Sequence, residues 1–326
     1  MTKAIQVRET GGAEVLCLQD VEVKDPSAGE ARLRQTAIGL NFIDVYFRDG
    51  SYPVPQLPFT PGMEAAGVVE AVGSDVSDLA VGDRVVYASP PMGSYSEERL
   101  MAADRLVKIP EGIDDRSAAA AMLKGMTAQY LLRQTADVKA GDTILFHAGA
   151  GGVGLIACQW AHHLGATVIA TVGAEEKAEL VRAHGCDHAI LYKQEDFVAR
   201  VDELTEGKGV DVIYDAVGLD TLSRGFECLR PRGMMVLFGA SSGKPEPVDP
   251  AVLQGGGSLF LTRPSLFDYV PDRESLLACA ADLFDVMQKG AVEIKVNQEW
   301  ALADAPQAHR ALEARETTGS TLLIPG

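Results

Sequence analysis

The sequence has little positive charge and no long apolar run. Its 326 residues contain 29 lysines and arginines against 46 aspartates and glutamates, which gives a formal net charge of −17. A surface of this sign repels phosphate backbones, and no Lys/Arg-rich run is present, so nucleic-acid binding is disfavoured. No stretch approaches the roughly 20 apolar residues of a membrane-spanning helix. The N-terminal MTKAIQVRET contains no apolar signal core. The composition therefore predicts neither a nucleic-acid partner nor a membrane partner.

Cysteine is also scarce. The five cysteines are scattered, odd in number and without any CxxC pair, which argues against a disulfide framework and against a structural zinc knuckle. They are Cys17, Cys158, Cys186, Cys228 and Cys279. The six histidines form no ligand pattern, and no Ser/His/Asp or Cys/His nucleophile arrangement is visible. We expect a cytoplasmic protein in which Cys158 is an inert, packed thiol.

The most informative stretch is residues 143–164, TILFHAGAGGVGLIACQWAHHL. It opens with a short apolar run, typical of a buried parallel strand, and continues into the GxGxxG element of Gly149, Gly151, Gly152 and Gly154. Apolar residues then recur with helical spacing from Val153 onward. Strand, glycine turn and helix in this order predict a dinucleotide-binding turn, because glycines let backbone N–H groups approach a pyrophosphate at the helix N-terminus.

The rest of the chain predicts an α/β protein with two domains. Residues 1–108 read as short strands and turns, with one short helix at 42–48, and 117–133 predicts a helical region in which Gly125 marks a junction between two helices. From residue 141, strands and helices alternate through six strands, the pattern of a doubly wound dinucleotide fold. The predicted strands are 143–147, 167–172, 189–192, 211–214, 233–239 and 258–262, with helices at 175–184 and 221–229. A long helix at 273–289, a strand at 292–296 and a short helix at 306–315 follow.

The end of the second of these strands indicates which nucleotide binds. NAD enzymes usually carry an acid there, bonded to the ribose 2′-hydroxyl. Here the strand ends at Val172 and Gly173 without an acid, and Lys177 follows one helical turn later. A missing carboxylate and a nearby ammonium favour a 2′-phosphate and hence NADPH, although Glu175 and Glu176 weaken the argument. The alternative is that Lys177 is a solvated helix lysine.

Several runs together resemble a known family along nearly the whole chain. They are AIGLNFIDVYFRDGSYP, PGMEAAGVVEAVG, VGDRVVYA, LKGMTAQYLL, FHAGAGGVGLIACQWA, YDAVG, FGASSG and TRPSL. The sequence resembles the zinc-independent quinone oxidoreductases of the medium-chain dehydrogenase/reductase superfamily, in particular the bacterial, zeta-crystallin-like enzymes. The resemblance implies a GroES-like, mainly β catalytic domain at 1–124 plus 265–326, a six-stranded Rossmann domain at 125–264, bound NADPH and a homodimer.

The same comparison bears on zinc. The zinc alcohol dehydrogenases of the superfamily have Cys where this chain has Asn41, His where it has Met63, and Cys at about Leu123. A catalytic zinc needs three good N, S or O donors, so the resemblance implies a site without metal. It leaves Glu64 with a structural hydrogen bond as its expected role.

The resemblance also implies site residues. Facing the nicotinamide are Asn41, Phe42, Asp44 and Tyr46, with Thr127 and Tyr130 nearby. The pyrophosphate contacts are Gly152 and Val153, within the turn of Gly149, Gly151 and Gly154. The adenosine and its 2′-phosphate match Gly173, Lys177, Tyr192 and Arg315. The wall along the nicotinamide riboside matches Val217, Phe238, Gly239 and Ser241, and the covering loop matches Pro264, Ser265 and Leu266.

Each assignment has a structural alternative. Asn41 and Asp44 are residue types that favour turns and helix caps. Tyr46, Tyr52 and Tyr130 can be packing aromatics, and Phe238 can belong to the core. We interpret Trp160 and His147 as structural. Relatives tend to have alanine at Gly149, and we expect either residue to leave the turn intact.

The predicted activity is the NADPH-dependent reduction of a quinone, with catalytic roles for Asn41, Tyr46, Tyr52 and Thr127. Asn41 would donate a hydrogen bond, and Tyr46, Tyr52 or water would supply protons; whether one or two electrons move at a time stays open. One alternative is an NADPH-dependent reductase of enones or enoyl thioesters on the same scaffold. Another, of a different class, is a non-catalytic NADPH-binding structural or RNA-binding protein, against which the acidic composition speaks.

Overall fold

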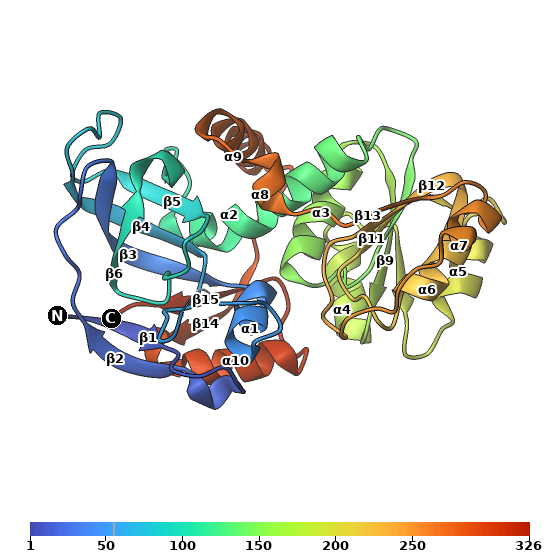
Figure 1. The fold of residues 1–326 in the computed structure, drawn as a ribbon. Helices are drawn as coiled ribbons and strands as arrows, with labels where there is room; N and C mark the ends of the chain where they lie inside the picture. The colour runs from blue at the N-terminus through green and yellow to red at the C-terminus, as the bar shows by residue number, and fades with distance from the viewer. Residues whose placement is uncertain (55) are drawn as a thin grey trace. The chain divides into compact units, whose positions relative to one another are not determined.

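The structure is a computed structural model that describes residues 1–54 and 56–326. The chain forms two compact units. The first comprises Met1–Met126, Val270–Phe284 and Ile294–Gly326, and the second comprises Thr127–Tyr269 and Asp285–Glu293. Both chain ends therefore belong to the first unit (Figure 1).

The first unit is mainly β. Strands β3 (Glu30–Leu40), β4 (Glu64–Val72), β5 (Arg84–Ala88), β6 (Glu98–Ala102), β7 (Val107–Lys108), β14 (Val296–Ala301) and β15 (Ser320–Ile324) form one sheet. Its order is β14-β15-β3-β4-β5-β7, with β6 also paired to β3. Strands β1 (Thr2–Gln6) and β2 (Cys17–Val21) form a separate antiparallel pair. Because β15 pairs with β3, the C-terminal segment is part of this sheet.

Alternation along β3 explains how this sheet acquires a core. Ala31 and Leu33 are fully buried, whereas Arg32 and Arg34 lie on the other face with partial or full exposure. This period of two is the pattern of a half-buried strand. The buried side chains of β3 join those of β4 and β5 in one cluster.

The helices that begin in the first unit, among the residues described, are α1 (Phe42–Asp49), α2 (Asp115–Gln129), α9 (Arg273–Gln288) and α10 (Ala305–Glu313). Short 3-10 turns occupy Ala13–Val15, Ala103–Arg105 and Leu302–Asp304. Helix α1 follows β3 directly, and β4 begins opposite the end of β3, where Gly39 pairs with Glu64. The sheet thus places the start of α1 beside the first residue of β4.

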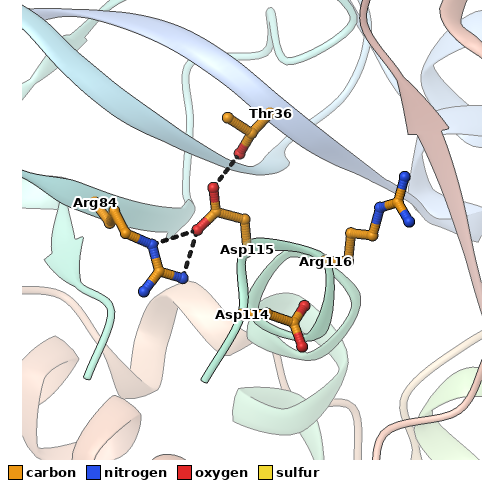
Figure 2. A pocket seen from close by; sticks show the side chains of 5 residues that line it. All are labelled: Thr36, Arg84, Asp114, Asp115 and Arg116. Atoms are coloured by element: carbon orange, nitrogen blue, oxygen red, sulfur yellow. Dashed lines mark hydrogen bonds and ion pairs between the residues drawn. The ribbon is translucent and has the colours of Figure 1, made fainter. Parts of the chain in front are cut away.

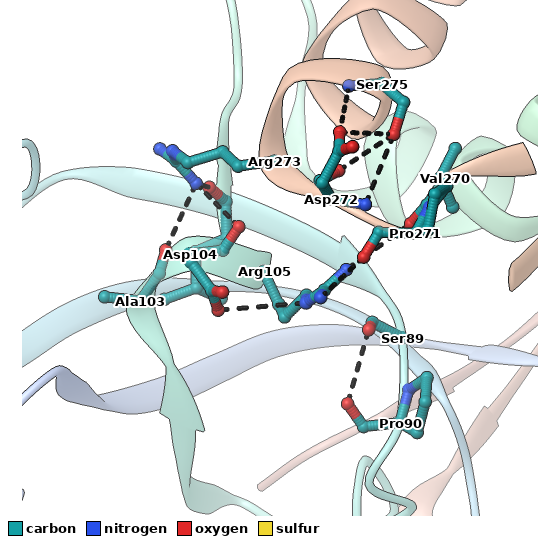
Figure 3. A network of polar contacts seen from close by, with 11 residues as sticks. Ser89, Pro90, Ala103, Asp104, Arg105, Val270, Pro271, Asp272, Arg273 and Ser275 are labelled. Carbon is teal, nitrogen blue, oxygen red and sulfur yellow. Dashed lines mark hydrogen bonds and ion pairs between the residues drawn. The ribbon is translucent and has the colours of Figure 1, made fainter.

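Two arginines fix the start of α9 to the first unit through backbone carbonyl groups. Arg273 donates to the carbonyl oxygen of Asp104 at 2.8 Å and also bonds the Asp78 carboxylate. In return Arg105 donates to the carbonyl oxygen of Pro271 at 3.0 Å. Figure 3 shows these two arginines crossing between the segments around residues 103–105 and 270–273. The contacts tie the C-terminal segment to the earlier part of the first unit.

The second unit is a doubly wound parallel sheet. Its strands are β8 (Thr143–Phe146), β9 (Thr167–Val172), β10 (His188–Leu191), β11 (Val210–Asp215), β12 (Leu229–Leu237) and β13 (Phe260–Thr262). They lie in the order β10-β9-β8-β11-β12-β13, and every pair is parallel. The helices are α3 (Gly152–His163), α4 (Glu175–Arg182), α5 (Phe197–Leu204), α6 (Leu222–Gly225), α7 (Pro250–Gly255) and α8 (Leu266–Tyr269). The predicted α/β class and six-stranded Rossmann sheet are confirmed.

Apolar residues of five neighbouring strands form the core of this unit, as expected for a sheet covered on both faces. Leu145, Ile169, Ile190, Ile213 and Met235 are fully buried in one cluster. Trp160, on the apolar stripe of α3, is also fully buried, which confirms its structural role.

Three predicted elements are wrong. Gly125 does not separate two helices, because α2 runs through it and is followed by a π-helical segment, Tyr130–Thr135. A Cβ at Gly125 would lie 2.6 Å from Leu283 Cδ2, so glycine lets the Leu283 side chain pack closely against α2. The strand expected at 292–296 is instead β14, which begins where the expected strand ends. The helix expected at 221–229 is short, since α6 ends at Gly225 and a 3-10 turn, Phe226–Cys228, leads into β12.

None of the helices within the described residues combines the length and the apolar character that crossing a membrane would require.

Candidate active site

The start of α1 is held by a reciprocal pair of capping bonds. Asn41 is the N-cap residue, with an extended backbone, and Asp44 is the third helical residue. The Asn41 side chain accepts the backbone N–H of Asp44, and the backbone N–H of Asn41 donates to Asp44 Oδ2 at 3.0 Å. Such a capping box satisfies helix-end groups that would otherwise lack partners. The capping role considered for these two residues is therefore confirmed.

The Asn41 side chain also contacts a buried ion pair. Its Nδ2 donates to Glu64 Oε2 at 2.7 Å and to the Gly39 carbonyl oxygen at 3.3 Å. Lys124 Nζ lies 3.2 Å from the same Glu64 oxygen, and the Leu123 N–H donates to Oε1. Glu64 is fully buried and Lys124 nearly so. These bonds confirm the structural role expected of Glu64, and they engage both amide protons of Asn41.

A chain of hydrogen bonds leads from Asp44 to α10. Tyr95 Oη lies 3.0 Å from Asp44 Oδ2 and 3.0 Å from His309 Nε2. His309 Nδ1 lies 3.2 Å from Arg48 Nη1, and Arg48 forms two bonds of 2.8 Å to the Glu313 carboxylate. Arginine only donates, so Nδ1 accepts, Nε2 carries the hydrogen, and Tyr95 donates to Asp44. The direction of every bond in the chain is thereby fixed.

Burial shifts the pKa values at both ends of this chain. Desolvation raises the pKa of Asp44 to about 7, although hydrogen bonds from Asn41 and Tyr95 act in the opposite direction. Desolvation and the positive charge of Arg48 lower the pKa of His309 to about 3. Asp44 Oδ1 is buried and has no partner among the described residues. The network therefore links a neutral imidazole, through Tyr95, to a carboxyl group whose pKa is raised to about 7.

Aromatic side chains line α1 and the residues after it. The ring centroids of Phe42 and Tyr46 are 5.5 Å apart, and those of Tyr46 and Tyr52 are 5.1 Å apart. The Tyr52 N–H donates to the Tyr46 carbonyl oxygen at 2.8 Å. All three side chains are half-buried. The structure thus brings the rings of Phe42, Tyr46 and Tyr52 together just after Asn41. Their contact with a ligand, and that of Asn41, stays a prediction.

In the second unit the glycine turn leads into α3 as predicted. Gly151 is the N-cap, and Gly152 begins the helix. A Cβ at Gly154 would lie 2.5 Å from the Gly149 carbonyl oxygen, so only glycine fits there. The expectation that alanine would also fit at Gly149 is wrong, because its Cβ would lie 2.6 Å from Ala170 Cβ on β9. The turn is closed by contacts with the neighbouring strand as well as by its own backbone.

The predicted nucleotide-binding residues follow the carboxyl ends of the parallel strands. Gly173 follows β9 and Tyr192 follows β10, and a Cβ on Gly173 would lie 3.0 Å from Tyr192 Oη. Lys177 is half-buried in the first turns of α4. Because all strands run in one direction, these residues share an edge of the sheet with the α3 N-terminus. Ligands of open parallel sheets bind at this edge.

The loops after β11 and β12 complete this edge. Buried Asp215 accepts the Val217 N–H at 2.7 Å, and the Phe238 N–H donates to the Asp215 carbonyl oxygen at 2.9 Å. The Ser241 N–H donates to the Ala216 carbonyl oxygen at 3.0 Å. Gly239 lies in the same loop, and β13 is followed by Pro264, Ser265 and Leu266. These bonds fix the shape of the loops, and the glycine turn at the α3 N-terminus together with Lys177 fits a dinucleotide bearing an additional phosphate.

The remaining predicted residues lie elsewhere in the chain. Tyr130 is buried and stacks on Tyr269 with ring centroids 4.5 Å apart, so packing accounts for its burial. Thr127 is half-buried in α2, and Arg315 is exposed, with a left-handed backbone, just after α10. His147 is buried at the end of β8, with Nδ1 3.0 Å from Thr171 Oγ1. Its structural interpretation is consistent with these contacts.

An open pocket of about 630 Å³ in the first unit contains none of the predicted residues. Figure 2 shows that two of its charged groups, Arg84 and Asp115, are paired with one another. Asp115 accepts hydrogen bonds from Thr36 and from Arg84, each at 2.7 Å. Arg116 forms an ion pair with Glu299. In the described residues, no three His, Cys, Asp or Glu side chains are grouped as metal ligands.

Sequence reasoning missed Arg48, Tyr95, Lys124 and His309. Arg48, Tyr95 and His309 lie in segments where the spacing of apolar residues gives no indication that a polar side chain is buried. Lys124 is the exception, because it is a single charge within the run AAAMLKGM. A lone lysine on an otherwise apolar helix indicates either an exposed edge or a buried partner, and Glu64 is that partner.

Residues 27–111 match a family model described as the alcohol dehydrogenase GroES-like domain, and 152–267 match one described as zinc-binding dehydrogenase. The chain is 51% identical over 325 residues to a quinone oxidoreductase of Pseudomonas aeruginosa, with 100% of both chains covered. It is 47% identical to a 2-haloacrylate reductase of Burkholderia sp, covering 100% of this chain and 99% of that one. The crystal structure of Escherichia coli quinone oxidoreductase complexed with NADPH superposes with a TM-score of 0.97 at 46% identity, covering 99% of this chain and 100% of that chain.

Proposed function

The chain belongs to the quinone oxidoreductases of the medium-chain dehydrogenase/reductase superfamily, and from this premise we propose that it transfers a hydride from NADPH to a quinone without zinc. It is an NADPH:quinone oxidoreductase with a GroES-like domain and a Rossmann domain. The hydride route, the independence from zinc and the residues that act are the proposed part. We assign the catalytic role to 1–124 plus 265–326 and nucleotide binding to 125–264.

The residues around Asn41 support catalysis without zinc. At the three positions where the zinc dehydrogenase pattern has ligands, this chain has Asn41, Met63 and Leu123, which are poor zinc donors. The adjacent carboxylate, Glu64, already accepts hydrogen bonds from Asn41, from the Leu123 backbone and from Lys124. A quinol oxyanion is much less basic than an alkoxide, so its formation depends less on a Lewis acid. The protein's part is then to orient the acceptor and exclude water.

The carboxyl edge of the second unit supports the choice of NADPH. NADPH supplies the hydride, and the second unit supplies the cradle: the amides at the start of α3 for the pyrophosphate, and Gly173, Lys177 and Tyr192 for the adenosine and its 2′-phosphate. The single observation on which the proposal depends most is that β9 ends at Val172 and is followed by Gly173 with no acid, while Lys177 lies on α4.

Lys177→Ala tests this assignment. We expect the affinity for NADPH to fall about tenfold or more while the affinity for NADH stays unchanged, since one charge-assisted phosphate contact is lost. Lys193→Ala, an exposed lysine just after Tyr192, is the matched control. Fluorescence titration with both nucleotides measures the ratio. An unchanged ratio of affinities would show that the 2′-phosphate binds elsewhere.

The relation to a 2-haloacrylate reductase supports a second candidate, the reduction of activated alkenes with NADPH. Both reactions add a hydride to an electron-poor, conjugated acceptor, so the same cradle serves both. Initial rates with a series of quinones and a series of enones and haloacrylates separate the two. Higher kcat/KM for every alkene than for every quinone would favour the second candidate.

Strand β13 supports a homodimer. It lies at the edge of the six-stranded sheet, and Phe260 on it is 54% exposed. An unprotected edge strand with an apolar side chain is a ready site for pairing with a second copy. Light scattering that gives the mass of a single chain would contradict this proposal.

The five free cysteines, four of them buried, support a cytoplasmic location.

A further inference from the structure

We propose that Lys124 is a catalytic residue whose ammonium group holds the acceptor oxygen that becomes negative during quinone reduction. The inference rests on the proposed function, because it takes a quinone as the acceptor and places that quinone beside Asn41. It adds a cation to a site for which sequence reasoning offered only amide and hydroxyl groups.

The position of Lys124 is the first support. Lys124 Nζ and Asn41 Nδ2 converge on one oxygen atom, Glu64 Oε2, at 3.2 and 2.7 Å. The other Glu64 oxygen is held by the Leu123 backbone N–H, so the carboxylate cannot rotate freely. Lys124 lies on α2 and Asn41 at the start of α1. The ammonium is therefore fixed next to the residue predicted to face the reacting ring.

A count of hydrogen bonds is the second support. An ammonium group has three N–H donors. Among the described residues, Glu64 Oε2 is the one acceptor found for Lys124, whose side chain is 8% exposed. Glu64, in contrast, accepts from three donors. Two N–H groups of a nearly buried cation thus remain for an external acceptor, at a place where an unmatched donor is costly.

The chemistry of the reaction needs a group of this kind. A quinone that takes up a hydride gains two electrons and one hydrogen, and becomes a quinol monoanion with the charge on oxygen. NADPH is oxidised to NADP⁺ in the same step, and water then supplies the proton that completes the quinol. Lys124 donates an N–H to the charged oxygen. Donors placed where charge develops are effective because they need no reorganisation during the reaction.

A purely structural role makes a different prediction. If Lys124 only balances the Glu64 charge, removing both charges together should restore the site, because the buried carboxylate is then no longer left without a partner. If Lys124 stabilises the oxyanion, removing both charges leaves the reaction slow. The double variant Glu64→Gln/Lys124→Met therefore separates the two roles, and it avoids the folding defect expected of Lys124→Met alone.

The kinetic test measures kcat/KM with NADPH for 1,4-benzoquinones whose quinols differ in pKa. We expect the double variant to be about 100-fold slower than Glu64→Gln, with the loss growing as the quinol becomes more basic. Lys124→Arg keeps the positive charge, so its kcat/KM should lie between that of the wild-type enzyme and that of the double variant. Lys3→Met, which removes an exposed lysine paired with Asp20, is the control. A loss that is the same for every quinone, or a double variant as fast as Glu64→Gln, would overturn the proposal.

A binding test does not depend on turnover. The enzyme loaded with NADP⁺ is titrated with 4-nitrophenol, whose phenolate absorbs visible light and mimics the quinol monoanion. Glu64→Gln should bind the phenolate in preference to the phenol and so lower the apparent pKa of the bound probe, whereas the double variant should not. Equal pKa values for the probe in both would overturn the proposal. If the wild-type enzyme reduces alkenes but no quinone, the proposed function fails, and this titration still decides the role of Lys124.

Discussion

Asp44→Asn should change how stability depends on pH, in a direction fixed by the buried network. The pKa of Asp44 is raised from 3.8 to about 7 by burial. Between these two values the folded protein binds a proton that the unfolded chain has released. Asp44 therefore makes the free energy of unfolding decrease as the pH rises from about 4 to about 7. A difference of about three pH units corresponds to roughly 4 kcal/mol, since each unit is 1.36 kcal/mol.

His309 acts in the opposite direction. Its pKa is lowered from 6.5 to about 3 by burial and by Arg48. Between pH 3 and 6.5 the unfolded chain binds a proton that the folded protein does not, so His309 makes the free energy of unfolding increase with pH. The two residues are linked through Tyr95 and titrate over overlapping ranges. In the wild-type protein their contributions largely cancel between about pH 4 and 6.5.

Asparagine at position 44 removes one of the two contributions. It keeps the shape of the side chain and an oxygen that accepts from the Asn41 N–H and from Tyr95, but it does not titrate. The difference in free energy of unfolding, variant minus wild type, should rise by about 4 kcal/mol between pH 4 and 7.5. Urea unfolding at intervals across this range measures it, with Asp25→Asn, an almost fully exposed side chain, as the control. A difference that does not change with pH would refute the reasoning about Asp44.

Three further outcomes follow from the same contacts. Gly154→Ala should lower NADPH affinity and thermal stability, because its Cβ would lie 2.5 Å from a carbonyl oxygen of the turn, whereas Gly255→Ala, which meets nothing within 4 Å, should not. Equal melting temperatures would contradict this. Arg48→Met should cost about 1–3 kcal/mol by urea unfolding, because it leaves the buried His309 Nδ1 and the Gly11 carbonyl oxygen without their donor, and an unchanged free energy of unfolding would show that these bonds contribute nothing net. In the native enzyme one thiol, Cys17, should react quickly with a disulfide reagent, and two or more fast thiols would show that the buried cysteines are accessible.

The sequence predicts the second unit better than the first, for a physical reason. The strand, glycine turn and helix of residues 143–164 are contiguous, so local spacing determines both the fold and the nucleotide edge. In the first unit the important contacts join distant positions. Arg48 meets His309, 261 residues away, and Asn41 meets Glu64 and Lys124. No periodicity reports such pairs.

The wrong predictions have equally local causes. The segment VNQEWA of β14 alternates between half-buried and exposed positions with few apolar residues, so the more apolar run before it looks more like a strand. Gly125 is a poor helix former. It nevertheless lies within α2, because the Leu283 side chain packs into the space that a Cβ at position 125 would occupy. In both places tertiary contacts override a local signal. The same holds at Gly149, where Ala170 on the neighbouring strand excludes a methyl group.

The most direct test of the central claim is the rate of NADPH oxidation by a quinone before and after removal of metal ions. The enzyme is dialysed against a strong chelator, its zinc content is measured by mass spectrometry, and turnover with NADPH and 1,4-benzoquinone is compared with that of the untreated enzyme. We predict an unchanged kcat with far less than one zinc per chain. A loss of activity that added zinc restores would contradict the account.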